Sequence, residues 1–98
     1  MFQLLHMAAL IAAMARPTPT AACTVVQVDE THFNATVTWS GFAVGSLDFL
    51  QGPTSIDQSE LKHASRRGDV TVTLSTTPTA VQLTGPKLGL RQACVLVA

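Results

Sequence analysis

The two cysteines are the residues whose chemistry most constrains this chain. Cys23 and Cys94 are the only cysteines in its 98 residues, and they lie 71 positions apart. In an oxidising compartment, such a pair is expected to form one disulfide. Closing a loop of this length stabilises a small domain by about 4 kcal/mol in the chain-entropy description. Two buried free thiols, or one lipidated and one free thiol, are the alternative interpretations.

A second candidate for chemistry is the Ser59-Glu60-Leu61-Lys62 segment, which matches the S-x-x-K pattern of serine acylases. In those enzymes a lysine one helical turn away activates the serine. An enzyme of this kind would need Ser59, Lys62, His63 and Asp69 to converge in one pocket. The partner motifs of serine acylases are absent from the sequence, which favours a solvated polar face here and no catalytic residue.

A histidine lies close in sequence to two carboxylates near residue 30. His32 follows Asp29 and Glu30 closely, whereas His6 and His63 are far from it and add no ligand cluster. A metal site normally needs three or four such ligands. The pattern therefore favours a turn with an exposed histidine, and we expect neither a metal site nor a cofactor.

Two short motifs have possible surface roles. Arg67-Gly68-Asp69 is the tripeptide that integrin ligands present on loops, and Asn34-Ala35-Thr36 matches the glycosylation acceptor pattern. Both are short enough to arise by chance in a chain rich in threonine. A turn with flanking charges explains the first motif, and the polar face of a strand explains the second.

The N-terminal segment indicates where the chain is sent. Residues 2–15 form an apolar run, interrupted only by Gln3 and His6, that ends in Ala13-Met14-Ala15. A run of this length is shorter than the roughly 20 residues of a membrane-spanning helix and is typical of a signal peptide. The alternatives are an apolar N-terminal helix packed on the domain, a start codon placed too early, or lipid attachment at Cys23. We expect residues 16–22, with Pro17 and Pro19, to form an extended linker.

Composition limits the remaining residues to one small domain, which we place at 23–98. Six basic and six acidic residues balance, and only 12% of residues are charged. Such a chain has no charge field to attract nucleic acid or an anionic membrane, so a nucleic-acid partner is not expected. Membrane attachment is expected only if residues 1–15 are retained or Cys23 is lipidated.

Alternating hydropathy predicts most of the strands. Residues 24–28 are a β-branched run, and residues 33–40 alternate apolar and polar side chains, with Trp39 on the apolar face. Another strand is expected over 42–50, bent at Gly45 and ended by Gly52-Pro53. Residues 69–75 and 79–84 predict an antiparallel hairpin around Pro78.

Two segments are harder to assign. Ser55 with Gln58 resembles a helix-capping box, and Ile56, Leu61 and Ala64 lie loosely on one helical face. We therefore predict a short helix near 55–66, with an irregular polar loop as the competing interpretation. The tail 86–98 suits either a helix beginning at Pro86 or a last strand over 94–97.

These elements predict a mainly β fold: a small antiparallel sheet or sandwich of five to six strands, preceded by an apolar signal-like helix. Cys23, Trp39 and Cys94 follow the order of an immunoglobulin-type sandwich, but the chain contains no tyrosine for the tyrosine corner of that fold. The expected function is a small exported, periplasmic or secreted, binding or structural domain. It would meet a protein or surface ligand through its loops, with residues 53–68 as the contact region. A membrane- or lipid-anchored protein and an enzyme subunit using residues 54–69 are the alternatives.

Overall fold

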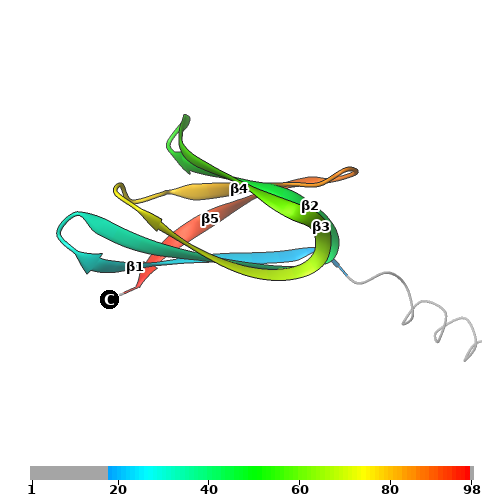
Figure 1. Ribbon diagram of the computed structural model, residues 1–98, viewed down its shortest axis with the longest axis horizontal. Helices are drawn as coiled ribbons and strands as arrows, with labels where there is room; N and C mark the ends of the chain where they lie inside the picture. Colours follow the sequence, from blue (N-terminus) through cyan, green and yellow to red (C-terminus); the bar gives the residue numbers. More distant parts are fainter. Residues whose placement is uncertain (1–17, 98) are drawn as a thin grey trace, which may run out of the picture.

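The computed structural model describes residues 18–97, which form five β-strands and no helix. The strands are β1 (Thr20–Asp29), β2 (His32–Gln51), β3 (Thr54–Leu74), β4 (Ala80–Thr84) and β5 (Gly89–Val97) (Figure 1). The predicted signal-like helix lies outside the described residues, as do residues 16 and 17 of the predicted linker. Within residues 18–97, no helix is long and apolar enough to cross a membrane.

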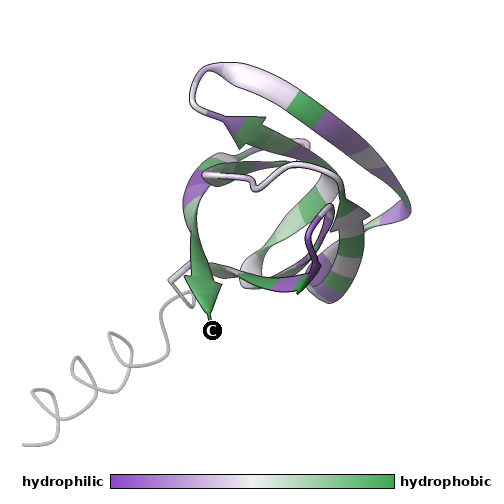
Figure 2. Cartoon of the chain, turned by 90° about the vertical axis from the view of Figure 1, so that its left-hand side faces the viewer, coloured by the Kyte–Doolittle hydropathy of each residue, from purple (hydrophilic) through white to green (hydrophobic). Residues whose placement is uncertain are grey.

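Four of the strands close into a small barrel. The first half of β2 pairs antiparallel with β1, β1 pairs parallel with β5, β5 pairs antiparallel with β4, and β4 returns to the second half of β2. Seen from the end, the strands run around a ring and a hairpin arches outside it (Figure 2). This hairpin is formed by β2 and β3, which pair along most of their length. A barrel, and not the predicted sandwich, is therefore how these strands cover their apolar faces.

The barrel closes because β2 bends and contributes two separate halves. Its pairing with β3 shifts register between Ser40 and Val44, and again between Val44 and Ser46. Gly41 lies in the first of these shifts with a φ of 90°, a left-handed conformation that favours glycine. A Cβ at Gly41 would also lie 2.9 Å from the carbonyl oxygen of Thr18. The irregular stretch thus spans Gly41, which separates the predicted strands 33–40 and 42–50, and the predicted bend at Gly45, within one continuous strand.

The interior follows the alternation seen in the sequence. Ala35, Val37 and Trp39 are buried at 0%, 0% and 4% exposure, as the period-two pattern over 33–40 predicts. Val70 and Val72 of β3 pack against the same core. The largest fully buried side chains come from three of the five strands, β1, β2 and β4: Phe49, Leu47, Leu83, Val25, Val37, Val44 and Val81.

A disulfide joins the two strands of the only parallel pair in the described fold. Cys23 of β1 and Cys94 of β5 are direct register partners, with their Cα atoms 4.6 Å apart and their sulfurs bonded. The register of this pair extends only to Val26 and Val97. We call this short junction, residues 23–26 and 94–97, the seam. The predicted disulfide is confirmed, and it lies where the ring of strands closes.

Trp39 packs on a glycine of the neighbouring strand. Gly68 is the register partner of Trp39, and a Cβ at Gly68 would overlap the indole ring. The indole Nε1–H donates a hydrogen bond to the carbonyl oxygen of Ser65, at 2.8 Å. The indole ring is therefore held by a hydrogen bond, and it fits there because Gly68 has no side chain.

The predicted helix near 55–66 is wrong, because this segment lies inside the 21-residue strand β3. Ile56 and Leu61 pack against the barrel core from an extended backbone. Their loose spacing fits a half-buried strand as well as one face of a helix, and the Ser55–Gln58 pattern forms no cap. Tertiary pairing with β2 decides between the two conformations.

The strand pairing corrects two further expectations and decides the assignment of the tail. The segments 69–75 and 79–84 do not form a hairpin with each other, because β3 pairs with β2 and β4 pairs with β2 and β5. The tail does not form a helix from Pro86, since residues 89–97 are strand β5. The sheet is also not purely antiparallel, as β1 and β5 run in the same direction.

The contact between Trp39 and Gly68 predicts the behaviour of a matched pair of glycine variants. Gly68→Ala should lower the free energy of unfolding by about 1–3 kcal/mol, because the added methyl must displace the indole ring. Gly45→Ala is the control: its Cβ would have no neighbour nearer than 3.9 Å. Urea denaturation of the two variants and the wild-type chain measures the difference. A Gly68→Ala midpoint equal to that of Gly45→Ala would contradict this packing.

Candidate functional site

The disulfide removes both thiols from consideration as reactive groups. Cys23 is 3% exposed and Cys94 is half-buried, and no free cysteine occurs among residues 18–97. The Cys23 sulfur cannot carry a thioether-linked lipid while it is bonded to Cys94. The two residues therefore have a structural role in the described fold.

A cleft at one end of the barrel is the clearest candidate for a binding site. Four segments that are distant in sequence form it: the residues just before β1, the bend of β2, Arg66 of β3, and the connection between β4 and β5. These segments lie toward the right-hand end of the barrel in Figure 1. The cleft has a volume of about 630 Å³ and is lined by Thr18, Pro19, Gly41, Phe42, Ala43, Arg66, Pro86, Lys87 and Leu88. We call it the mouth cleft.

The charge of the mouth cleft has one sign. Arg66 and Lys87 line it and no acidic residue does. Within the described part of the chain, the one ion pair is between His32 and Asp29, so neither cation is paired with a carboxylate. The Arg66 guanidinium donates a 3.4 Å hydrogen bond from Nη2 to the Gly41 carbonyl oxygen. Guanidinium groups carry five N–H donors, so most of those on Arg66 are available to a ligand.

The mouth cleft also has apolar walls. Phe42 is 5% exposed and anchors the floor in the barrel core, whereas Leu88 is 42% exposed at the rim. Pro19 and Pro86 supply two further rigid apolar surfaces. A mainly apolar cleft of several hundred cubic ångströms with a few placed polar groups is the usual form of a small-molecule site.

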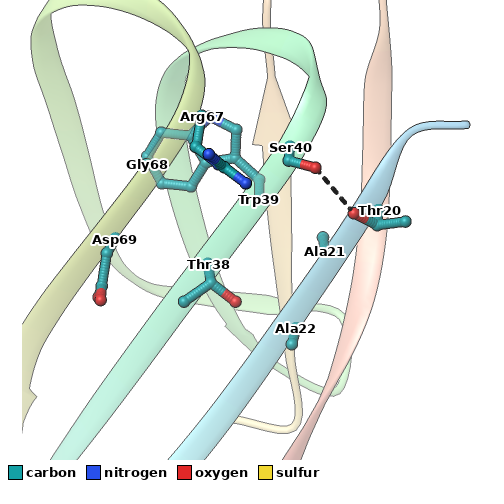
Figure 3. Close-up of a pocket in the computed structure, with 9 residues that line it drawn as sticks. All are labelled: Thr20, Ala21, Ala22, Thr38, Trp39, Ser40, Arg67, Gly68 and Asp69. Atoms are coloured by element: carbon teal, nitrogen blue, oxygen red, sulfur yellow. Dashed lines mark hydrogen bonds between the residues drawn. The ribbon is translucent and has the colours of Figure 1, made fainter. Parts of the chain in front are cut away.

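A shallower surface hollow of about 570 Å³ adjoins the mouth cleft. Register places its nine residues in three rows across β1, β2 and β3: Thr20–Ser40–Arg67, Ala21–Trp39–Gly68 and Ala22–Thr38–Asp69. The hydroxyl oxygens of Thr20 and Ser40 are 3.3 Å apart (Figure 3). The hollow thus carries hydroxyls and both signs of charge, without the single sign that distinguishes the mouth cleft.

The Arg67-Gly68-Asp69 motif lies within β3 and not on a loop. Gly68 is explained by the ring of Trp39, and the flanking side chains of Arg67 and Asp69 line the shallow hollow. The interpretation of this motif as a turn is therefore wrong, since the tripeptide is part of a paired strand.

The residues considered for an enzyme are not brought together. Ser59, Lys62, His63 and Asp69 all lie along β3. The helical turn that would carry Lys62 to Ser59 does not form. No hydrogen bond joins any two of the four side chains within residues 18–97, and only Asp69 lines a hollow described above.

His32 and Asp29 do meet, in the turn between β1 and β2. His32 Nδ1 lies 2.9 Å from Asp29 Oδ1, and the Thr31 backbone N–H donates to the same oxygen at 2.8 Å. The Thr31 backbone hydrogen bond, followed by the contact with His32, lowers the pKa of Asp29 below its ordinary value of 3.8. Groups of three potential metal ligands do not occur in residues 18–97. The pair lies in the turn, and within residues 18–97 the other potential ligand, Glu30, forms no side-chain hydrogen bond or ion pair with it.

Asn34 lies on the outer, polar face of β2, as its place in the alternating pattern predicts. Its side chain is half-buried, and its Oδ1 accepts a 2.8 Å hydrogen bond from the Thr73 hydroxyl on β3. A second cross-strand contact joins the hydroxyls of Thr36 and Thr71, at 3.0 Å. The two polar residues of the Asn34-Ala35-Thr36 motif, Asn34 and Thr36, therefore help to pair β2 with β3.

Sequence reasoning missed the mouth cleft almost entirely. Of the segment 53–68 that we expected to make contacts, only Arg66 lines it. From sequence, Pro86 indicates only a possible helix start, and Gly41 only the gap between the predicted strands 33–40 and 42–50. Both positions carry turn or bend signals, and turns that meet at the end of a barrel are a common place for a ligand site.

Comparison with known proteins adds no relative to this picture. No protein-family model, no curated protein and no solved structure matches the chain. Function must therefore be argued from the mouth cleft, the disulfide and the surface chemistry of the barrel.

The contacts of Asp29 predict that removing the His32 side chain only partly restores the ordinary pKa of this carboxyl. His32→Ala should raise the pKa of Asp29 toward 3.8 without reaching it, because the Thr31 backbone hydrogen bond remains and is the larger cause. Since the folded-state pKa is the lower one, the stabilising effect of the turn is complete above the unfolded-state pKa and is lost as pH falls through the folded-state pKa. An NMR titration of the Asp29 carboxyl measures this. A wild-type pKa at or above 3.8 would contradict the contacts.

Proposed function

We propose that this chain is a small exported binding domain, with the mouth cleft as its recognition site. The observation that carries the proposal is the convergence of unpaired Arg66 and Lys87 with apolar walls in one cleft. A surface with only a structural role has no need to gather two cations of the same sign around an apolar hollow.

The disulfide supports the exported part of the proposal. Structural disulfides persist in secreted and periplasmic proteins and are rare in the reducing cytosol. The bond between Cys23 and Cys94 is consistent with an oxidising compartment. The predicted signal peptide over residues 1–15 points in the same direction, because a chain that uses it enters such a compartment.

The recognition region proposed here differs from the loop expected from sequence. Residues 54–74 form a strand paired with β2, so they offer a regular polar surface and not a loop. The proposed contacts come from the β2 bend, the β4–β5 connection and one residue of β3, Arg66. Loops and bends held by a rigid scaffold are where binding residues concentrate.

Intact mass of the exported protein tests this proposal. We express the full chain with its natural N-terminus, collect the exported fraction and measure its mass with and without reductant. The expected product has lost about fifteen N-terminal residues and gains about two mass units on reduction. Recovery of the whole chain only in the cytosol, with both cysteines reduced, would contradict export. Full mass in a membrane fraction would indicate an anchored protein, and added mass on a chain beginning at Cys23 would indicate lipidation.

A further inference from the structure

We infer that the ligand of the mouth cleft is a small amphipathic anion: an apolar chain ending in a carboxylate or a similar oxyanion. This inference rests on the proposed binding function and specifies its ligand class. The cleft joins an apolar floor at Phe42 to the two cations Arg66 and Lys87. A ligand that satisfies both parts must itself have an apolar part and a negative end.

The apolar part of the site is built to exclude water from a hydrocarbon chain. Phe42 is 5% exposed and belongs to the barrel core, so its position is fixed by packing. Leu88 at the rim is 42% exposed and has apolar surface that a ligand chain would cover. Covering apolar surface is favourable in proportion to its area, at about 25 cal/mol per Å².

The cationic part selects the sign of the ligand. The nine lining residues include two cations and no carboxylate. Arg66 uses one Nη2 donor on the Gly41 carbonyl oxygen, at 3.4 Å, which orients its side chain along the cleft wall. A planar guanidinium can bind a carboxylate with two parallel hydrogen bonds, whereas the Lys87 ammonium acts as a point charge. A cationic ligand would be repelled, and a neutral one would form weaker hydrogen bonds with these residues than an anion does.

The size of the cleft favours a small molecule over a protein partner. Its volume is about 630 Å³ and nine residues line it. Pockets for small ligands span about 300–1,000 Å³. A stable protein interface uses about 20–30 residues on each side, and a nine-residue cleft falls well below that.

The test uses the exported, oxidised protein and four probes titrated by NMR and calorimetry. Decanoate carries both features, acetate carries only the charge, decanol carries only the chain, and decylamine carries the opposite charge. We expect decanoate to bind most tightly and to shift the backbone amides of residues 41–43 and 87–88. Acetate and decylamine should bind at least about tenfold more weakly than decanoate.

Matched variants test whether the two cations of the mouth cleft bind the carboxylate of decanoate. Arg66→Gln should weaken decanoate binding at least about tenfold and leave the affinity for decanol unchanged, because one charged hydrogen-bonding partner is removed. Lys87→Gln should cause a smaller loss. Arg67→Gln is the control, since Arg67 is the next residue of β3 but lines the shallow hollow of Figure 3 and not the mouth cleft. Its decanoate affinity should equal that of the wild-type protein.

Three results would overturn the inference, and each is distinguishable from failure of export. Equal weakening by Arg66→Gln and Arg67→Gln would show that charge acts over the whole surface and not in the cleft. Equal affinity for decanoate and decanol would show that the cleft takes apolar ligands without selecting charge, which leaves a binding function intact. Amide shifts confined to the exposed residues Val26, Val95 and Leu96 would place the probe on the seam.

Discussion

The described fold depends on a covalent bond at its one parallel pairing. Three of the four junctions of the barrel are antiparallel pairs whose register follows the chain through bends and connections. The fourth junction, the seam, joins β1 and β5, which lie near opposite ends of the chain and share only four register positions. Bringing such distant segments together lowers the entropy of the chain before any contact between them forms. The Cys23–Cys94 bond makes this entropy loss on folding smaller, because it already restricts the unfolded chain. The ring of strands can therefore close around a modest core.

Closure of the seam has consequences at the other end of the barrel. β2 can serve two sides of the ring only because it bends near Gly41, and the bend places Phe42 under the mouth cleft. The residues before β1 are laid over Gly41 by the same arrangement, since Thr18 is its close neighbour. The cleft is thus a product of the way the barrel closes. The two cations of the cleft are Arg66 on β3 and Lys87 in the β4–β5 connection. They are distant in sequence, so no local pattern predicts that they line the same cleft.

The local hydropathy pattern predicts where most of the strands lie, but it does not predict which strands pair with each other. The alternation over 33–40 and 70–74 correctly assigns the buried faces of two strands, because one-sided burial imposes period two. The sequence predicts a helix over 55–66 because the spacing of Ile56 and Leu61 fits either a helix or a strand, and only pairing with β2 resolves the ambiguity.

The parallel pairing of β1 with β5 is a long-range property, although the cysteine pair does predict that these ends meet. The mouth cleft joins four segments that are distant in sequence, so no spacing rule could assemble it. The disulfide, in contrast, follows from counting cysteines and judging the compartment.

The most direct test of this account is the free energy of unfolding of the exported protein with the disulfide intact and with it removed. Urea denaturation of the oxidised wild-type protein is compared with that of the double variant Cys23→Ala and Cys94→Ala, without reductant in either sample. The account predicts that the double variant is less stable by about 4 kcal/mol, the entropy of closing a loop of this length. For a domain of this size, such a loss removes a large share of the total stability. Equal free energies of unfolding would contradict the claim that the Cys23–Cys94 bond holds the barrel closed.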